Sequence, residues 1–342
     1  MSHSLPIPDF FASDRVGEVW RVPYEERATQ AKNWAQIHGI KPADRDSPRL
    51  CLLAIDVQNT FCIPGFELFV GGTSGQGAVD DTRRLCEFVY GNLGQITEIV
   101  PTMDTHRAMQ IFHAVFWIDG DGQMPAPMTM VELEDVRSGR WRVNPAIVPS
   151  LGVPLGQLED FALHYVKRLS DDGKYPLTIW PYHSMLGGIG HSLVSAFEEA
   201  CFFHNVARQS QTRFELKGSN PLTENYSVLR PEVLDDAAGQ PVAKKNQALI
   251  QHLMTFDAVA IAGQAKSHCV AWTIDDLLSE IQQVEDATLA SKIYLIDDCS
   301  SPVVVPGVVD FSANADAAYQ RFAEAGMNII QSTSPMTDWL PD

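Results

Sequence analysis

LAIDVQNTFC (residues 53–62) and AIAGQAKSHCV (residues 260–270) are the two stretches that decide the fold of this chain. Each is an apolar run of strand length that stops at a reactive side chain, the carboxylate of Asp56 in the first and the thiol of Cys269 in the second. In an open parallel sheet, substrates bind at the ends of the strands, where loops present catalytic groups. A carboxylate and a thiol that meet there form a base and a nucleophile, so the sequence is typical of an enzyme.

Strands and helices alternate around these two stretches, which predicts a three-layer α/β/α domain with a mainly parallel central sheet. Residues 110–117 could form an additional strand beside the five that follow. Continuous apolar runs predict buried strands at residues 49–57, 98–103, 258–263, 292–297 and 327–331. Helical spacing predicts helices at residues 24–37, 79–93, 188–206, 240–254, 269–281 and 312–325.

Two segments are expected to elaborate one domain of residues 49–342, rather than to form a second domain of equal size. Residues 1–48 are polar and mixed, and we expect them to pack on the core as an extension. Residues 118–177 are interrupted repeatedly by glycine and proline, which predicts an irregular insertion with little room for long helices or strands. Such an insertion suits a lid or an oligomer contact.

Composition excludes several classes of partner. The chain has 342 residues, 45% of them hydrophobic, and its 25 Lys+Arg against 43 Asp+Glu give a formal net charge of -18. Nucleic acids and anionic membranes reward clustered positive charge, so neither is an expected partner. No secretory signal or membrane-spanning stretch is evident, and the six cysteines are scattered. A cytoplasmic protein, in a reducing compartment, is the expectation.

Three side chains are candidates for the chemistry. Cys269 lies where a strand meets a helix, and a helix N-terminus favours thiolate over thiol, although a small buried cysteine is an equally good interpretation of its position. Asp56 ends a very apolar strand, where burial would raise its pKa; the alternative is a turn former. Lys217, in FELKGSNP (residues 214–221), matters only if its ammonium reaches both, and would otherwise be a surface residue.

A second group of side chains has the makings of a metal site. DTH (residues 104–106) presents Asp104 and His106 on the same side of an extended backbone, and WPYH (residues 180–183) supplies His183. One carboxylate and two imidazoles, completed by water, suit zinc, manganese or iron. A single histidine is more often a satisfied core or surface group, and His113 is expected at most to brace the Asp104 loop.

Taken together, these motifs resemble the nicotinamidase branch of the isochorismatase-like cysteine hydrolases, in the order in which that family carries them. The resemblance covers half to two-thirds of the chain. The matching segments are residues 56–65, 104–106, 180–183, 217–218 with 226–227, and 263–270.

The resemblance implies a catalytic role for each member of the triad. Cys269 would attack the amide carbonyl and form a thioester, Asp56 would take the thiol proton and later activate water, and Lys217 would stabilise the charges between them. The backbone N–H groups of Ala265 and Cys269 would form the oxyanion hole. The peptide bond between Gln264 and Ala265 would be cis.

The resemblance also implies how a substrate would be held. Asp104, His106 and His183 would bind a divalent metal ion, most readily zinc, that holds the ring nitrogen of a pyridine-like amide. Phe61 and Trp180 would sandwich the ring, although ordinary core packing is the competing interpretation. The implied activity is hydrolysis of nicotinamide to nicotinate and ammonia by a homo-oligomer.

Departures from the family pattern keep other substrates and roles open. Ser184 stands where a cysteine is common in nicotinamidases, Thr60 replaces a common acidic residue, and the chain is longer. The same triad could therefore act on another amide or on a ureido compound. A non-catalytic binding protein, or hydrolysis by the metal alone with a structural Cys269, are the remaining alternatives.

Overall fold

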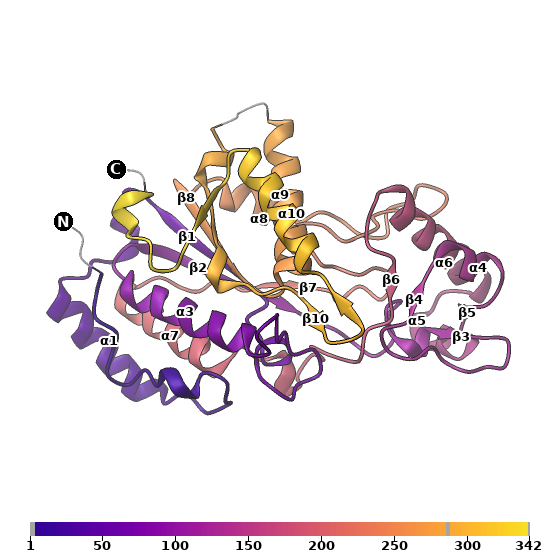
Figure 1. Cartoon of the computed structure of the whole chain (residues 1–342), viewed down its shortest axis with the longest axis horizontal. Coiled ribbons are helices and arrows are strands. Elements are labelled where there is room, and N and C mark those ends of the chain that lie inside the picture. The colour runs from indigo at the N-terminus through magenta and orange to yellow at the C-terminus, as the bar shows by residue number, and fades with distance from the viewer. Residues whose placement is uncertain (1–3, 285–287, 341–342) are drawn as a thin grey trace.

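The computed structural model describes residues 4–284 and 288–340, in which six strands form one parallel sheet (Figure 1). The strand order is β12-β9-β8-β1-β2-β7, and every neighbouring pair is parallel, so the predicted α/β architecture with a parallel central sheet is confirmed. The strands are β1 (Leu50–Ile55), β2 (Ile96–Asp104), β7 (Glu215–Lys217), β8 (Ala258–Gly263), β9 (Ile293–Ile296) and β12 (Asn328–Ile330).

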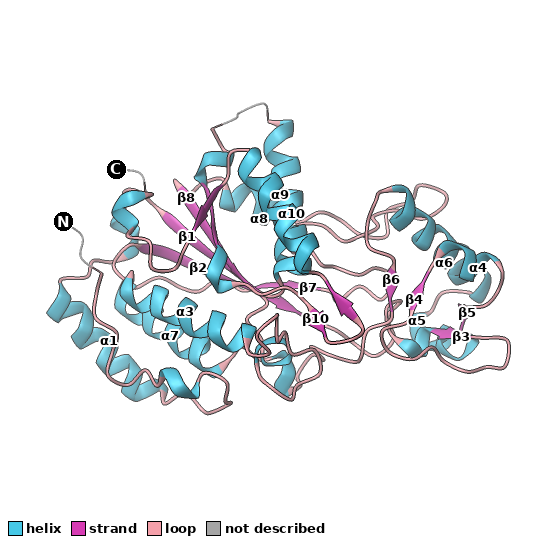
Figure 2. Ribbon diagram, viewed as in Figure 1, coloured by secondary structure: helices cyan, strands magenta, loops and turns pink. Residues whose placement is uncertain are grey.

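Helices cover both faces of this sheet (Figure 2). Strand β1 is buried along its whole length, and its side chains alternate between the two faces. Leu50, Leu52 and Ala54 pack into one core, whereas Cys51 and Leu53 pack into the other. The first core is closed by α1 (Tyr24–His38), α3 (Gly77–Gly91) and α7 (Ser195–Arg208), and the second by α8 (Gln247–Leu253), α9 (Ala271–Gln283) and α10 (Ser312–Glu324).

Helix α1 lies against α7 rather than against the sheet itself (Figure 1). Arg27 of α1 donates to Glu199 of α7 over 2.7 Å, and both side chains are almost completely buried. A buried ion pair that loses one partner leaves an uncompensated charge, so this contact fixes how α1 lies on the domain.

A third hydrophobic core belongs to a lobe that projects from the sheet, at the right of Figure 1. The expectation that residues 118–177 leave little room for long elements is wrong, because α6 (Leu155–Asp171) runs for 17 residues within them. Residues 110–117 do not form the further strand either, since only Trp117 is in a strand. The other elements of the lobe are α4 (Leu133–Arg137), α5 (Val148–Leu151), β3 (Trp117–Ile118), β4 (Met130–Val131), β5 (Arg142–Val143) and β6 (Leu177–Thr178).

Three prolines of this lobe begin helical turns instead of breaking them, whereas Pro125, Pro127 and Pro176 lie outside helices. Pro145 and Pro149 occupy the first turns of short helical segments, and Pro154 is the residue that caps the start of α6. Proline is well suited to these positions because the first helical N–H groups have no partner within the helix. Proline therefore marks helix starts in residues 145–154, but irregular chain in residues 123–129.

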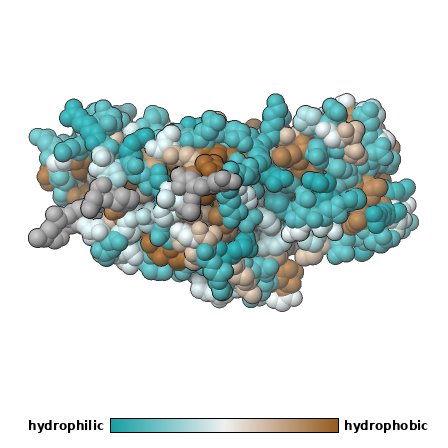
Figure 3. Space-filling view, turned by 90° about the horizontal axis from the view of Figure 1, so that it is seen from above, coloured by the Kyte–Doolittle hydropathy of each residue, from teal (hydrophilic) through white to brown (hydrophobic). Residues whose placement is uncertain are grey.

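Other predicted helices begin later than expected, because the residues before them form loops. The helix expected from residue 188 starts at Ser195, and the one expected from residue 240 starts at Gln247. Within residues 4–284 and 288–340, no helix is both long and apolar enough to span a membrane. Figure 3 shows hydrophilic side chains over most of one face of the molecule.

We predict that His204 makes folding stability depend on pH. His204 of α7 is buried and bonds through Nε2 to the carbonyl of Ile96 over 2.8 Å, and burial lowers its pKa to about 4. The unfolded chain, with a histidine pKa of about 6.5, binds the proton first as the pH falls. The free energy of unfolding should therefore be about 2 kcal/mol lower at pH 5 than at pH 7.5 because of this single group.

Urea unfolding at pH 7.5 and pH 5.0 measures this effect. His204→Gln should lose about 2 kcal/mol less than the wild type between the two pH values. His38→Gln, at the half-buried end of α1, is the matched control and should follow the wild type. Equal losses in wild type and His204→Gln would contradict the assignment.

Candidate active site

Four adjacent strands bring the chemistry-bearing side chains to one edge of the sheet. In the order β8-β1-β2-β7, Cys269 follows β8, Asp56 follows β1, Asp104 ends β2 and Lys217 ends β7. Asp104 and Lys217 are paired in the register of their two strands. Parallel pairing thus gathers groups that are far apart in sequence, as expected at the carboxyl ends of strands.

The ammonium group of Lys217 is the centre of this cluster. Its Nζ lies 3.0 Å from Asp56 Oδ2 and 2.9 Å from Asp104 Oδ1. It also donates to the backbone carbonyl of Asn225 over 2.8 Å and lies 3.6 Å from Cys269 Sγ. Although burial alone would lower it, the charges of Asp104 and Asp56 raise the pKa of Lys217 well above its usual value. The side chain is therefore a fixed cation.

Asp56 is held by its own backbone and by a neighbouring strand. Its φ of 49° turns the chain sharply at the end of β1. Its N–H donates to Thr102 Oγ1 over 3.1 Å, and the Thr102 hydroxyl donates to Asp56 Oδ1 over 2.5 Å. Burial raises the pKa of Asp56, and Lys217 opposes that rise. The second carboxylate oxygen is thereby left on the side of Lys217, as a base whose proton affinity is increased.

Cys269 rests as a thiol, contrary to the expectation that its position favours the thiolate. It lies in the turn of residues 266–270 that precedes α9, and its side chain is buried. Burial raises the pKa of Cys269 well above its usual value; Lys217 acts to lower it and Asp56 to raise it. Desolvation thus outweighs the attraction of Lys217 for the thiolate. The sulfur therefore needs a base to become a nucleophile.

The turn between β8 and Cys269 is shaped by residues 263–265. The Gln264–Ala265 peptide bond is cis, as predicted. Gly263 has a φ of 117°, and a Cβ atom at this position would lie 2.0 Å from the carbonyl oxygen of Ile55, so only glycine fits. Gln264 donates from its backbone to that same carbonyl and from its side chain to Asp81 over 2.8 Å. The turn is therefore fixed at both ends.

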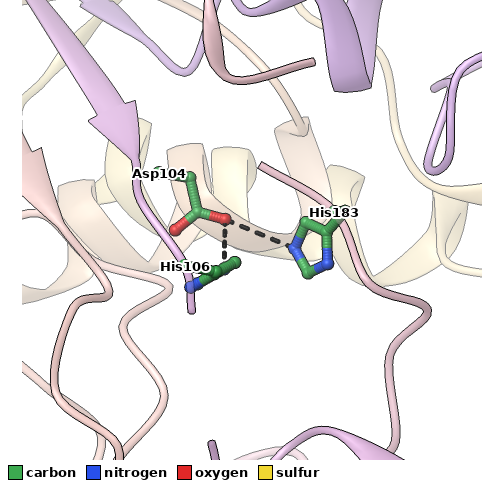
Figure 4. Close-up of side chains that lie close together, drawn as sticks. All are labelled: Asp104, His106 and His183. Carbon is green, nitrogen blue, oxygen red and sulfur yellow. Dashed lines mark ion pairs between the residues drawn. The ribbon is translucent and has the colours of Figure 1, made fainter. Parts of the chain in front are cut away.

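Asp104, His106 and His183 form a buried cluster (Figure 4). This cluster adjoins Lys217, whose ammonium contacts Asp104. Asp104 Oδ2 lies 2.7 Å from His106 Nε2 and 3.4 Å from His183 Nε2, and the ligand atoms all lie within 4.8 Å of one another. The Nδ1 atoms face the carbonyl oxygens of Gly218 and Pro181, at 3.0 and 2.8 Å respectively.

This arrangement suits a divalent cation. Because a carbonyl oxygen only accepts hydrogen bonds, each Nδ1 carries a proton, and each Nε2 points towards Asp104, where it would offer its lone pair to a bound cation. Although burial acts to lower it, the charge of Asp104 raises the pKa of His106. Metal-binding histidines are usually oriented in this way by a backbone carbonyl. His113, expected to brace this loop, bonds to the carbonyl of Ala108 and places its ring edge-on to His106.

One carboxylate joins the two clusters. Oδ1 of Asp104 accepts from Lys217, whereas Oδ2 faces the two imidazoles. Although burial acts to raise it, the charges of His106 and Lys217 hold the pKa of Asp104 well below its usual range. Asp104 is therefore ionised, and the two clusters, Asp56–Lys217–Cys269 and Asp104–His106–His183, form one electrostatic unit.

A cavity of about 280 Å³ opens onto this unit. Phe61 and Trp180, the two aromatic residues expected to hold a ring, both line it together with Cys269. Trp180 is fixed by a bond from its Nε1 to Tyr226 Oη over 3.1 Å. The wall also includes the charged or polar side chains of Asp104, His183, Lys217 and Glu224.

Sequence patterns missed three contributors to the site. Thr102 holds Asp56, the carbonyl of Asn225 holds Lys217, and Glu224 lines the cavity. A threonine within a strand carries no signal of its own. Asn225 acts through its backbone, which no side-chain motif reveals. Only Glu224, a carboxylate two residues before the Tyr226-Ser227 motif, could have been noticed.

Comparison with protein-family models and with curated proteins gives no match. Among solved structures, the chain is similar to the Acinetobacter baumanii nicotinamidase/pyrazinamidase, at 18% identity and a TM-score of 0.48, over 84% of this chain and 98% of that one. It is also similar to the yeast nicotinamidase bound to the inhibitor nicotinaldehyde, at 18% identity and a TM-score of 0.49, over 82% and 99%. The N-carbamoylsarcosine amidase from Thermoplasma acidophilum has 13% identity and a TM-score of 0.42, over 84% and 98%.

We predict that Gly218→Ala weakens binding of zinc. A Cβ atom at Gly218 would lie 2.7 Å from His106 Cε1 and 2.8 Å from Asp104 Oδ1, which would displace two ligands and the carbonyl that orients His106. Loss of such support typically weakens metal binding by roughly 10- to 100-fold. Metal content after equilibration with zinc, measured by mass spectrometry, checks this.

Gly239→Ala is the matched control for this substitution. Gly239 has a similar φ, 75° against 83°, but nothing lies within 4 Å of the Cβ position. It should suffer the same backbone strain and keep the affinity of the wild type. Zinc affinities that are equal in the two variants would contradict a ligand cluster at residues 104–106 and 183.

Proposed function

We propose that this chain is a metal-containing cysteine amidohydrolase acting on a carboxamide of a small aromatic nitrogen ring, with nicotinamide as the leading substrate. The observation that carries the proposal is the position of Lys217 Nζ, 3.0 Å from the carboxylate of Asp56 and 3.6 Å from the sulfur of Cys269. A base, a cation and a thiol that share one cavity are the parts that thiol-based acyl transfer needs. The substrate class comes from the motif resemblance, and the volume and aromatic lining of the cavity support it.

In the first half of the reaction, Asp56 takes the proton from the Cys269 thiol as the sulfur attacks the amide carbon. Lys217 stabilises the thiolate as it forms, which compensates for the burial that raises the pKa of the thiol. The tetrahedral oxyanion is held by the N–H groups of Ala265 and Cys269. Asp56 then returns the proton to the leaving nitrogen, ammonia departs, and a thioester on Cys269 remains.

In the second half, water replaces ammonia. Asp56 takes a proton from the water as its oxygen attacks the thioester carbon, and the same N–H groups hold the second oxyanion. Collapse of this intermediate breaks the C–S bond, and the proton passes from Asp56 back to the sulfur. The products are the carboxylic acid and the free enzyme, so Asp56 and Lys217 end in their starting states.

Ring recognition uses the other side of the cavity. Phe61 and Trp180 would hold the ring between them, and Phe61 also contacts the imidazole of His183 edge-on, with 5.7 Å between the ring centroids. Asp104, His106 and His183 would bind the metal, zinc before manganese or iron, which supplies a Lewis acid for the ring nitrogen. We also propose a cytoplasmic location, which the free cysteines at all six positions support. Self-association of the chain is a further part of the proposal.

We predict that Cys269→Ala abolishes ammonia release from nicotinamide, by roughly 10⁴-fold or more, because no other group can form the thioester. Coupled-enzyme detection of ammonia measures the rate. Cys86→Ala, which removes another buried thiol from the core beside α3, is the matched control and should remain active. Retention of activity in Cys269→Ala, together with its loss on chelation, would favour hydrolysis by the metal alone.

A further inference from the structure

Glu224 is a buried carboxyl group that the proposed reaction does not use. It lines the same cavity as Cys269, and only 5% of its surface is exposed. Its Oε1 accepts the N–H of Asn225 over 3.2 Å, whereas its other carboxyl oxygen has no hydrogen-bond partner among residues 4–284 and 288–340. Burial raises the pKa of Glu224 to about 7. This side chain thus brings a carboxyl oxygen that no protein group satisfies to the wall of the cavity.

Within the described residues, 4–284 and 288–340, the two cationic side chains on this side of the cavity already have partners. Lys217 already contacts Asp56, Asp104 and the carbonyl of Asn225, and His106 faces Asp104. Much of the remaining wall is apolar. When a ligand fills the cavity, this oxygen loses its access to water, and an acceptor buried without a donor is unfavourable, so the ligand itself should supply the donor.

We propose that Glu224 is a specificity-determining residue that accepts a hydrogen bond from a second N–H group of the substrate, such as an amino substituent on its ring. This inference rests on the proposed amidohydrolase function and narrows its substrate class to amides that carry a ring amino or lactam N–H donor besides the scissile carboxamide. A site that forms such a bond discriminates strongly against an analogue without the donor, because its own buried group is then left unpaired.

A purely structural role for Glu224 predicts something different. Through Asn225, whose carbonyl accepts from Lys217, Glu224 could simply support the catalytic cation. Glu224→Gln separates the two roles, because the amide oxygen can still accept the Asn225 N–H while the amide nitrogen replaces the free acceptor with a donor. A support role would change all substrates alike.

The test compares kcat/KM for nicotinamide, pyrazinamide and the 2-, 5- and 6-amino derivatives of nicotinamide. At least one amino derivative should exceed nicotinamide by about tenfold in the wild type. Glu224→Gln should remove that advantage, so that the ratio of kcat/KM for the amino derivative to kcat/KM for nicotinamide falls from about ten to about one. Glu232→Gln is the control: it alters another buried carboxyl, which lies 3.3 Å from Lys174 and does not line the cavity, and the preference should persist.

A binding measurement separates failure of this inference from failure of the proposed function. Calorimetry with Cys269→Ala should show that the amino derivative binds about tenfold more tightly than nicotinamide. In the double variant Cys269→Ala with Glu224→Gln, this difference in affinity should be lost. If no amide is hydrolysed but this preference holds, the function is wrong and the role of Glu224 stands. No preference in either assay, or an equal loss for every amide in Glu224→Gln, overturns the inference.

Discussion

The whole site depends on one buried ammonium shared by two buried carboxylates. Lys217 has 2% of its side chain exposed, and Asp56 and Asp104 are as deeply buried, so none of these charges could persist without the others. Two carboxylates and one ammonium have a net negative charge. The imidazoles of His106 and His183 lie beside Asp104, where they face this excess negative charge. Consequently, the cluster of Asp56, Lys217 and Cys269 must form together with the cluster that Asp104 makes with the two histidines.

The parallel sheet makes this assembly possible by aligning the ends of four strands. The pairing of Asp104 with Lys217 is a register match between β2 and β7, and the pairing of Ile55 with Gly263 sets Asp56 beside the turn that leads to Cys269. A shift of one residue in either pairing would turn these side chains to the opposite face of the sheet. The geometry of the site and the strand register are therefore the same constraint, and it falls on two central strands, β1 and β8, which are entirely buried because helices cover both faces of the sheet.

Short windows of sequence predicted the features that depend on neighbouring residues alone, such as buried strands and short motifs. Continuous apolar runs were sufficient to predict β1 and β8, and the residues proposed for the triad and the metal site lie at strand ends or in short motifs. Helix α6 was also within reach, because Leu158, Phe161, Ala162, Tyr165, Val166 and Leu169 repeat at helical spacing and are buried, but proline was interpreted as a breaker. Contacts such as Thr102 with Asp56 depend on long-range register, and the raised pKa of Cys269 depends on total burial; neither is written in a window of sequence.

Chemistry and substrate choice arise in different parts of this chain. The strand ends supply Asp56, Lys217 and Cys269, whereas Trp180 comes from a segment that packs with the core of the projecting lobe. Glu224 lies in the loop after β7, where its backbone N–H donates to Tyr165 of α6 over 3.1 Å. The lobe thus fixes one wall of the cavity without contributing to the triad. Because a pocket discriminates through the groups that contact the remote part of a substrate, the lobe is where selectivity among amides would be set.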